Sequence, residues 1–363
     1  MKKLRVAVIG AGMIAQSAHL PAYRYFSDRF SVCAVSDVNE KAAKDAAEKF
    51  DIPHVYTDAE EMLQSEKPDL VSVCAPNRLH KSMTLAALRN GAHVVCEKPL
   101  AFTLHDAKEM FDAAREKGLL LCACQSMRFT PDRLAAKAFL ENGNAGTPYY
   151  CEFSRIRRRG IPFWGTFHIK EKSGGGALVD IGVHMLDAAL WLMGSPEVDR
   201  VSGTTARKLH TELGSAKGSG ALSGNLQNAR TFDPSEMNVE DFASGHITFK
   251  NGGSMNFKVA WAANLPDETT IRIAGEKAGI LLPEAKIYSG EKDVSDLAVS
   301  PDAFAVGAPF SGHFHVLYHF YDSIVNGAPL VIKPEETINT AGILEAFYRS
   351  AELSREVSFD ELS

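Results

Sequence analysis

The sequence has little of what marks a membrane or secreted protein. Its most apolar long segment, Gly176–Gly194, contains two aspartates and a histidine and is too polar to span a bilayer. The apolar stretch Leu4–Ile9 behind the N-terminal lysines is too short for a signal peptide and runs straight into a glycine motif. We therefore expect a cytoplasmic protein without a membrane partner.

An excess of positive charge is also missing. The 39 Lys and Arg residues against 45 Asp and Glu residues give a net charge of −6, which argues against a nucleic-acid partner. The densest basic cluster, Arg155–Gly160, fits either a solvated strand end or a loop that faces a substrate. The six cysteines mostly sit in apolar stretches, which is typical of reduced, buried thiols in the cytoplasm.

A complete set of metal ligands is absent from any single segment. Cys122 and Cys124 have no matching Cys or His pair nearby. His313, His315 and His319 invite a zinc site, but no carboxylate or thiol completes the set within their segment, and aromatic neighbours favour a packed helix. The sequence therefore predicts no metal site.

What is present in the first third of the chain is an alternation of apolar runs and helix-like stretches. The runs show little polar alternation, as expected for strands buried on both faces. The predicted strands are Leu4–Ile9, Val32–Ser36, Asp69–Cys74, His93–Cys96 and Leu119–Cys124, with helices near 13–26, 39–49, 58–65, 80–90 and 104–117. Serial strand–helix–strand units predict an α/β fold whose first domain, 1–125, is a Rossmann-type doubly wound parallel sheet.

The pattern changes beyond residue 125. A helix is expected near 131–142, and His246–Trp261 carries a hairpin signal in which polar and apolar residues alternate around Asn-Gly-Gly. Gly214–Gly224 is interpreted as a mobile loop within the second domain, and a closing helix is expected at about 335–355. These features predict a second α/β domain, 126–363, with a large open and mainly antiparallel sheet.

A dinucleotide fingerprint follows the first strand. Gly10 permits the tight turn of a G-x-G-x-x-A motif, Gly12 lets the backbone approach a pyrophosphate, and Ala15 allows close packing of helix on strand. The helix that begins here offers N–H groups near Met13 and Ile14 to the phosphates. The alternative is that the glycines form only a tight turn.

Asp37 ends the next predicted strand, 22 residues after Ala15, where an acid would bind the ribose hydroxyls. A carboxylate there would repel a 2′-phosphate, and no Arg or Lys follows immediately. We therefore expect NAD as the cofactor and consider NADP less favoured. The alternative interpretation makes Asp37 the N-cap of the following helix.

The next strands also end in polar groups. Pro76, Asn77 and His80 follow one strand and Glu97 and Lys98 the next, at the edge where doubly wound folds bind ligands, so we expect all five beside the cofactor. Pro99 is expected to fix the direction of Lys98, and a cis bond is one way to do so. The alternative is a structural ion pair between Lys98 and Glu97.

Asp180 and His184 are four residues apart and would share one helix face. The glycines just upstream suit a close approach of the backbone to a ligand. A lysine, an aspartate and a histidine that converge on a nicotinamide would form a proton-handling set for hydride transfer. The alternative interpretation makes His184 a core histidine.

The motifs GAGMIA, PNRLH, EKPL and GGGALVDIGVHMLD, in this order, resemble those of the Gfo/Idh/MocA oxidoreductases, and the segment from Lys333 to Val357 is similar to the closing helix of that family. The resemblance covers nearly the whole chain, although 204–234 matches poorly. It implies an NAD(P)-binding Rossmann domain, a second domain with a large open sheet, and a homodimer or homotetramer. It implies Lys98, Asp180 and His184 as the catalytic set, with Asn77, His80 and Glu97 near the cofactor.

The resulting prediction is an NAD-dependent dehydrogenase or reductase that acts on a secondary hydroxyl of a sugar, sugar derivative or cyclitol. Arg157, Trp164 and His168 are the candidate substrate-binding residues, because a flat ring stacks well on a pyranose, although surface packing explains Trp164 and His168 equally well. Two other functions stay open, a redox-neutral NAD-dependent glycosidase and a non-catalytic sensor of NAD or sugar.

Overall fold

The computed structural model describes residues 2–162, 165–209, 233–290, 294–298 and 312–362, and the chain forms two compact units. The first unit comprises Met1–Ser126 and Val306–Ile338, and the second comprises Met127–Ala305 and Asn339–Ser363. The predicted division assigned all of 126–363 to the second domain, and the structure differs from it at Val306–Ile338. The reason is that the apolar side chains of this late segment pack on the first unit.

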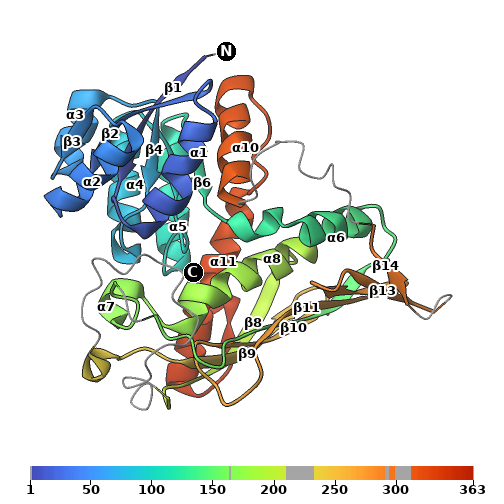
Figure 1. Cartoon of the computed structure of the whole chain (residues 1–363). Helices are drawn as coiled ribbons and strands as arrows, with labels where there is room; N and C mark the ends of the chain where they lie inside the picture. Colours follow the sequence, from blue (N-terminus) through green and yellow to red (C-terminus); the bar gives the residue numbers. More distant parts are fainter. Residues whose placement is uncertain (1, 163–164, 210–232, 291–293, 299–311, 363) are drawn as a thin grey trace. The chain divides into compact units, whose positions relative to one another are not determined.

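The first unit contains a parallel sheet of six strands among the described residues, in the order β3-β2-β1-β4-β5-β6 (Figure 1). The strands are β1 (Leu4–Ile9), β2 (Phe30–Ser36), β3 (His54–Tyr56), β4 (Leu70–Val73), β5 (His93–Cys96) and β6 (Leu121–Ala123). The predicted Rossmann sheet is confirmed, except that β3 was missed because it is only three residues long and not fully buried. The strand order reverses between β1 and β4, and the carboxyl ends of the strands beside such a reversal bind ligands.

The helices of the first unit lie against this sheet (Figure 1). They are α1 (Leu20–Tyr25), α2 (Glu40–Phe50), α3 (Ala59–Glu66), α4 (His80–Arg89), α5 (Leu104–Glu116) and α10 (Gly312–Asn326). Side chains cap three of them, because Asn39, Asp58 and Thr103 each accept a hydrogen bond from the first turn of α2, α3 and α5, respectively. The predicted helix 13–26 is divided, since a π-helical segment, η1 (Ala15–His19), precedes α1.

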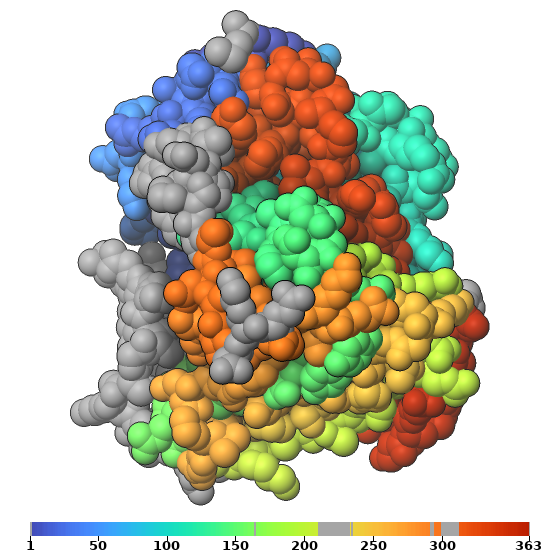
Figure 2. Space-filling model, turned by 90° about the vertical axis from the view of Figure 1, so that its right-hand side faces the viewer, coloured from blue at the N-terminus to red at the C-terminus, as the bar shows by residue number. Residues whose placement is uncertain are grey.

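Helix α10 joins the first unit through aromatic packing. Phe314 makes edge contacts with Tyr25 and Phe26 at ring-centroid distances of 5.6 and 6.0 Å. Tyr321 packs on Phe30 in the same way. In Figure 2, the orange-red surface of α10 lies beside the blue N-terminal segment. Burial of these rings explains why a segment more than 300 residues from β1 completes the first unit.

The second unit is built on a sheet of nine strands within the described ranges, in the order β14-β13-β12-β11-β7-β10-β9-β8-β15. The strands are β7 (Pro148–Ile156), β8 (Val198–Ala206), β9 (Phe242–Phe249), β10 (Ser254–Ala260), β11 (Glu268–Gly275), β12 (Ala278–Leu282), β13 (Lys286–Ser289), β14 (Ser295–Asp296) and β15 (Val357–Ser358). All neighbours are antiparallel except β7 and β10. The predicted hairpin forms as β9 and β10, whereas the predicted loop Gly214–Gly224 lies outside the described residues.

Helices α6 (Pro131–Glu141), η4 (Leu178–Gly182), α8 (Val183–Leu192) and the part of α11 (Pro334–Leu353) beyond Asn339 pack on one face of this sheet (Figure 1). α11 is the expected closing helix. One helical stretch, Lys170–Leu192, which also includes the short α7 (Lys170–Ser173), is long and apolar enough by composition to cross a membrane. However, 89% of its most apolar window is buried inside the protein, as in a core helix.

Candidate active site

The glycine loop after β1 has the form that a dinucleotide needs. Gly10 has φ +93°, and a Cβ there would lie 2.7 Å from the carbonyl carbon of Cys74, so only glycine fits. A Cβ on Gly12 would meet nothing within 4 Å, so the backbone is open to a ligand at this point. Met13 is 46% exposed and Ile14 is partly exposed. This open cradle at the start of a helix fits the pyrophosphate of NAD.

Asp37 follows β2 beside this loop. Its Oδ2 accepts a hydrogen bond of 2.8 Å from the N–H of Ala11, and its Oδ1 accepts one of 2.9 Å from Asn39. The N-cap of α2 is Asn39, whose side chain accepts from Ala42, so the N-cap alternative for Asp37 is wrong. The carboxylate is partly exposed and tied to the glycine loop, which suits it to bind the ribose hydroxyls.

His80 connects two strand-end loops. Its Nδ1 lies 2.7 Å from the carbonyl oxygen of Pro99, and its Nε2 lies 2.9 Å from that of Ala75. Burial is the main cause that lowers the pKa of His80, so the neutral ring, with one N–H, is favoured. Pro76 is exposed and Asn77 partly exposed at the same loop, whereas His80 is buried. His80 thus positions the loops, while Pro76 and Asn77 are the groups open to a ligand.

Lys98 follows β5 and is partly exposed. The peptide bond between Lys98 and Pro99 is cis, as the sequence suggested. The N–H of Lys98 donates to Oε2 of Glu97 at 3.2 Å, so the buried glutamate holds the backbone that carries the lysine.

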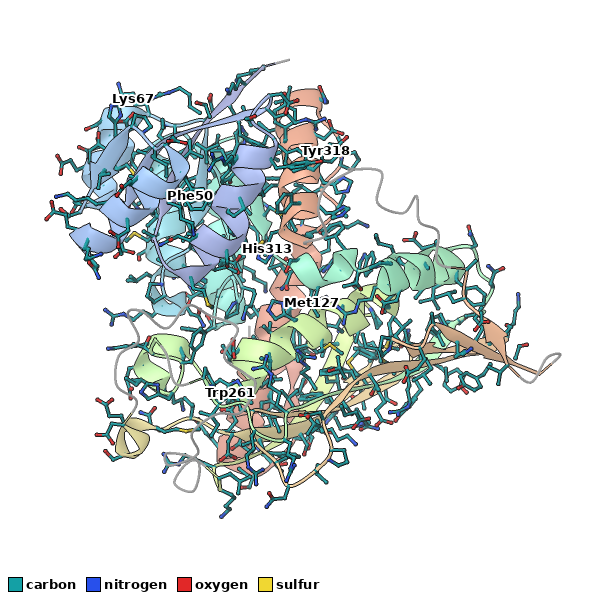
Figure 3. The ribbon with its side chains drawn as sticks, viewed as in Figure 1. Phe50, Lys67, Met127, Trp261, His313 and Tyr318 are labelled. Atoms are coloured by element: carbon teal, nitrogen blue, oxygen red, sulfur yellow. The ribbon has the colours of Figure 1, made fainter. Side chains whose placement is uncertain are left out.

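Glu97 is 5% exposed, and its carboxylate faces the interior of the first unit. Its Oε1 lies 2.8 Å from His19 Nε2 and 3.1 Å from His313 Nε2. Burial acts to raise the pKa of Glu97, but the hydrogen bonds from the two histidines outweigh it and hold that pKa well below its usual value. This cluster was missed from the sequence because its members come from separate segments. Figure 3 labels His313 at the start of α10.

Asp180 and His184 stand out on the central helix of the second unit. Every residue from Gly175 to Met193 is buried except these two, which are partly exposed. They are four residues apart on η4 and α8, as the spacing predicts. The indole Nε1–H of Trp261, labelled in Figure 3, donates to Asp180 Oδ2 at 3.0 Å. The helix therefore presents an oriented acid and an imidazole on a rigid apolar frame.

The glycines before this helix are needed for a different reason from the expected approach of a ligand. A Cβ on Gly176 would lie 2.0 Å from the carbonyl oxygen of Glu240, and one on Gly175 would lie 2.2 Å from the Tyr348 hydroxyl. The Glu240 carboxylate accepts from the N–H groups of Gly176 and Leu178 and from the Tyr348 hydroxyl, at 2.8–3.1 Å. The close approach is therefore made by the protein itself, and it fixes the start of the helix that carries Asp180.

A buried ion pair between Arg128 and Asp187 also holds α8 in place. Arg128 Nη2 donates to Asp187 Oδ1 at 2.6 Å and Arg128 Nε donates to Oδ2 at 2.7 Å, with both side chains 1% exposed. A bidentate pair of this kind also adds directional specificity. The start and the middle of the helix are thus anchored by different polar contacts.

Among the described residues, the two predicted substrate-binding residues Arg157 and His168 do not line a common pocket. Arg157 follows β7, is partly exposed and donates to the carbonyl oxygen of Gly160 at 3.5 Å. His168 is buried, with Nε2 3.7 Å from Glu236, so it packs inside the unit and does not line an open pocket. Trp164 lies outside the described residues.

Two family models match the chain. "Oxidoreductase family, NAD-binding Rossmann fold" matches residues 4–124, and "GFO/IDH/MocA C-terminal domain" matches residues 134–281. The first match ends close to the end of the Rossmann sheet. The second begins in α6 and ends within β12, so it covers the helix with Asp180 and His184.

Similar proteins extend these matches. The chain is 35% identical to D-glucoside 3-dehydrogenase of Escherichia coli (strain K12) over 356 residues, which cover 98% of this chain and 97% of that protein. Two solved structures share the fold. An oxidoreductase domain protein from Kribbella flavida has a TM-score of 0.83 at 22% identity, and the match covers 99% of this chain and 100% of that one. Levoglucosan dehydrogenase in complex with NADH and levoglucosan has a TM-score of 0.80 at 21% identity, and the match covers 99% of this chain and 100% of that one. The chain therefore belongs to the Gfo/Idh/MocA family and is an NAD-dependent oxidoreductase that acts on CH–OH groups.

Proposed function

We propose that the protein is a dehydrogenase that oxidises a secondary ring hydroxyl of a sugar, with D-glucosides as its foremost substrate class. The 35% identity to a D-glucoside 3-dehydrogenase along nearly the whole of both chains supports this substrate class. The observation that carries the proposed chemistry is the pair Asp180 and His184, partly exposed on a helix whose other residues are buried. An acid and an imidazole held in this way can orient a hydroxyl and remove its proton.

In the proposed mechanism, His184 accepts the proton of the reacting hydroxyl. The glycine loop and Asp37 would hold NAD, which would accept the hydride from the carbon that bears this hydroxyl. The ammonium of Lys98 stabilises the negative charge that develops on the oxygen as the proton leaves. In the reductive direction His184 returns the proton, so the same residues serve both directions.

Asp180 orients the substrate in this mechanism. Trp261 donates to one of its carboxylate oxygens and thereby fixes the direction of the group. A carboxylate accepts hydrogen bonds from sugar hydroxyls and would hold the ring for reaction at one carbon. We also propose Gly10, Gly12, Met13, Ile14, Pro76 and Asn77 as the loop groups that border the cofactor.

The test is to incubate the purified enzyme with NAD and a panel of methyl D-glucosides, free D-glucose, levoglucosan and inositols, and to follow NADH absorbance. We expect the fastest NADH formation with a D-glucoside, and NMR of the product identifies the oxidised carbon. If the whole panel yields no NADH, the proposed function is wrong. Cleavage of a glycoside without accumulation of NADH would identify the redox-neutral glycosidase instead.

Lys98→Ala tests the proposed charge-stabilising group. We expect normal folding and NAD binding with kcat lower by about 10²–10⁴, the usual range for a proton-handling group. Lys41→Ala, which removes an exposed lysine that pairs with Asp45 four residues on, serves as the control. If Lys98→Ala stays within a few-fold of the wild type, Lys98 is structural. A large fall in Tm would support the ion-pair alternative.

We further propose that the enzyme assembles as a homodimer or homotetramer, as the family resemblance implies. Light scattering coupled to size-exclusion chromatography gives the mass in solution. A monomer at micromolar concentration would contradict this proposal.

A further inference from the structure

Four side chains of metal-binding type meet inside the first unit. His19 ends η1, Glu97 follows β5, Cys124 follows β6, and His313 lies at the start of α10 (Figure 3). One ligand atom from each lies within 4.8 Å of the other three. All four residues belong to the same compact unit, so one packed body holds the complete set.

The spacing of these atoms suits a small tetrahedral cation. Zinc binds nitrogen and oxygen at about 2.0–2.2 Å and sulfur at about 2.3 Å, so tetrahedral ligand atoms lie roughly 3.2–3.8 Å apart. Glu97 Oε1 is 2.8 Å from His19 Nε2 and 3.1 Å from His313 Nε2. Outward movements of a few tenths of an ångström would therefore open the centre of the cluster to the ion.

The charges of these ligands also match a divalent cation. His19, Glu97 and Cys124 are buried, and His313 is partly buried. A buried carboxylate is expensive without a compensating charge. One carboxylate and one thiolate with two neutral imidazoles neutralise a 2+ ion, so the occupied site would carry no net charge.

Zinc binds neutral imidazole and thiolate, so an ion in this cluster would displace the proton of the Cys124 thiol as it binds.

An outer layer of hydrogen bonds orients one ligand. His19 Nδ1 lies 3.1 Å from Ser72 Oγ, which in turn lies 2.5 Å from the Tyr23 hydroxyl. Metal-binding histidines normally use their second nitrogen in this way, which fixes the ring and its tautomer. Nε2 of His19 is thereby directed at the centre of the cluster.

We propose that this cluster is a structural zinc site whose ligands are His19 Nε2, Glu97 Oε1, Cys124 Sγ and His313 Nε2. Four protein ligands leave no open position for water, which is the arrangement of structural rather than catalytic zinc. The ion would tie α10 to the strand-end loop that carries Lys98. The proposal does not depend on the substrate proposed above.

The first measurement is the metal content of the full-length, untagged protein by inductively coupled plasma mass spectrometry, before and after dialysis against a strong chelator and reloading with zinc. We expect about one zinc per chain, loss of the ion together with a lower Tm after chelation, and recovery of both on reloading. Protein that holds only substoichiometric zinc and shows no saturable 1:1 binding on titration would overturn the proposal.

The second measurement identifies the ligands in protein loaded with Co²⁺. A thiolate ligand gives a charge-transfer band in the near ultraviolet, which should disappear in Cys124→Ser and persist in Cys122→Ser, a buried thiol two residues away that serves as the control. If Cys124→Ser does not fold, His313→Asn, on the partly buried helix start, should weaken zinc binding at least about tenfold. Wild-type zinc affinity in both Cys124→Ser and His313→Asn would place the ion elsewhere and overturn the assignment.

Discussion

Two pairs of polar residues, one pair in each unit, are held in opposite ways. In the first unit, Glu97 and His80 are buried and held by hydrogen bonds to other side chains or to backbone carbonyls. In the second unit, Asp180 and His184 are partly exposed on a helix whose other residues are buried. Polar contacts therefore hold the first pair of residues in place, whereas the helix that carries the second pair is held largely by the apolar packing of its other side chains.

This difference predicts different consequences of mutation. A buried polar group shares its partners with a network, so its removal leaves those partners unsatisfied and lowers stability. A partly exposed group on a well-packed helix can change with little effect on packing. We therefore expect changes at Glu97 or His80 to lower stability and changes at Asp180 or His184 to lower activity.

The largest effect is expected for His184→Asn. Loss of the base should lower kcat/KM for substrate oxidation by about 10²–10⁴ while Tm stays near that of the wild type. The neutral imidazole is the form that accepts a proton, so wild-type kcat/KM should rise with pH through one ionisation. The variant should lack this rise, and pH–rate profiles of both proteins measure it.

His246→Asn is the matched control, because His246 lies on the sheet of the same unit and pairs with Asn256. It should keep both the activity and the pH profile. Persistence of the rising limb in His184→Asn would mean that another group is the base.

The next largest effect is expected at Asp187, which is an exception to the contrast between the two pairs although it lies on the same helix as His184. Asp187 lies three residues after His184, but its carboxylate is buried with Arg128. Asp187→Ala leaves a buried guanidinium without its partner and should lower the free energy of unfolding by about 3–5 kcal/mol. Urea unfolding measures this loss.

The double variant Arg128→Met/Asp187→Leu should recover most of the loss, because it buries no charge. A single variant as stable as the wild type would show that water reaches this pair.

A smaller loss is expected in the first unit for His80→Phe. The phenyl ring keeps much of the volume but removes the one N–H that the neutral ring donates to the carbonyl of Pro99 or of Ala75, which should cost about 1–3 kcal/mol. Wild-type kinetics and an unchanged Kd for NAD in a folded variant would indicate a purely structural role. A large rise in that Kd with unchanged stability would instead make His80 a direct cofactor ligand.

His80 also predicts a dependence of stability on pH. Its pKa is lowered in the folded state, mainly by burial and also by Lys98, while the backbone contacts and Glu97 act to raise it. The unfolded chain therefore takes up this proton first, and stability falls as the pH drops below the unfolded value of about 6.5. Urea unfolding at several pH values should show a shallower fall in His80→Phe than in the wild type.

The smallest effect concerns the choice of cofactor. The wild type should bind NAD at least about tenfold more tightly than NADP, or about 1.4 kcal/mol, because Asp37 would repel a 2′-phosphate. Asp37→Ala combined with Val38→Arg, at a neighbouring exposed position, should relax or reverse this preference. Equal Kd values of the wild type for the two cofactors, by calorimetry, would contradict the role of Asp37.

Some features could be predicted from the sequence because their determinants are local. The glycine loop, the Rossmann strands and the spacing of Asp180 and His184 each depend on residues a few positions apart. The predictions that needed distant partners were less successful. Gly175 and Gly176 make room for Glu240 and Tyr348, and His168 is buried, neither of which is visible in the local pattern.

The sequence by itself determined the fold class, the cofactor loop and the acid–imidazole pair, because hydrophobic periodicity and turn chemistry act over one or two helical turns. Only the tertiary structure decided that Val306–Ile338 returns to the first unit, and that His313 reaches Glu97 across 216 positions of the chain. The physical reason is that α10 buries its aromatic side chains on the first unit, and this packing places His313 beside the buried carboxylate.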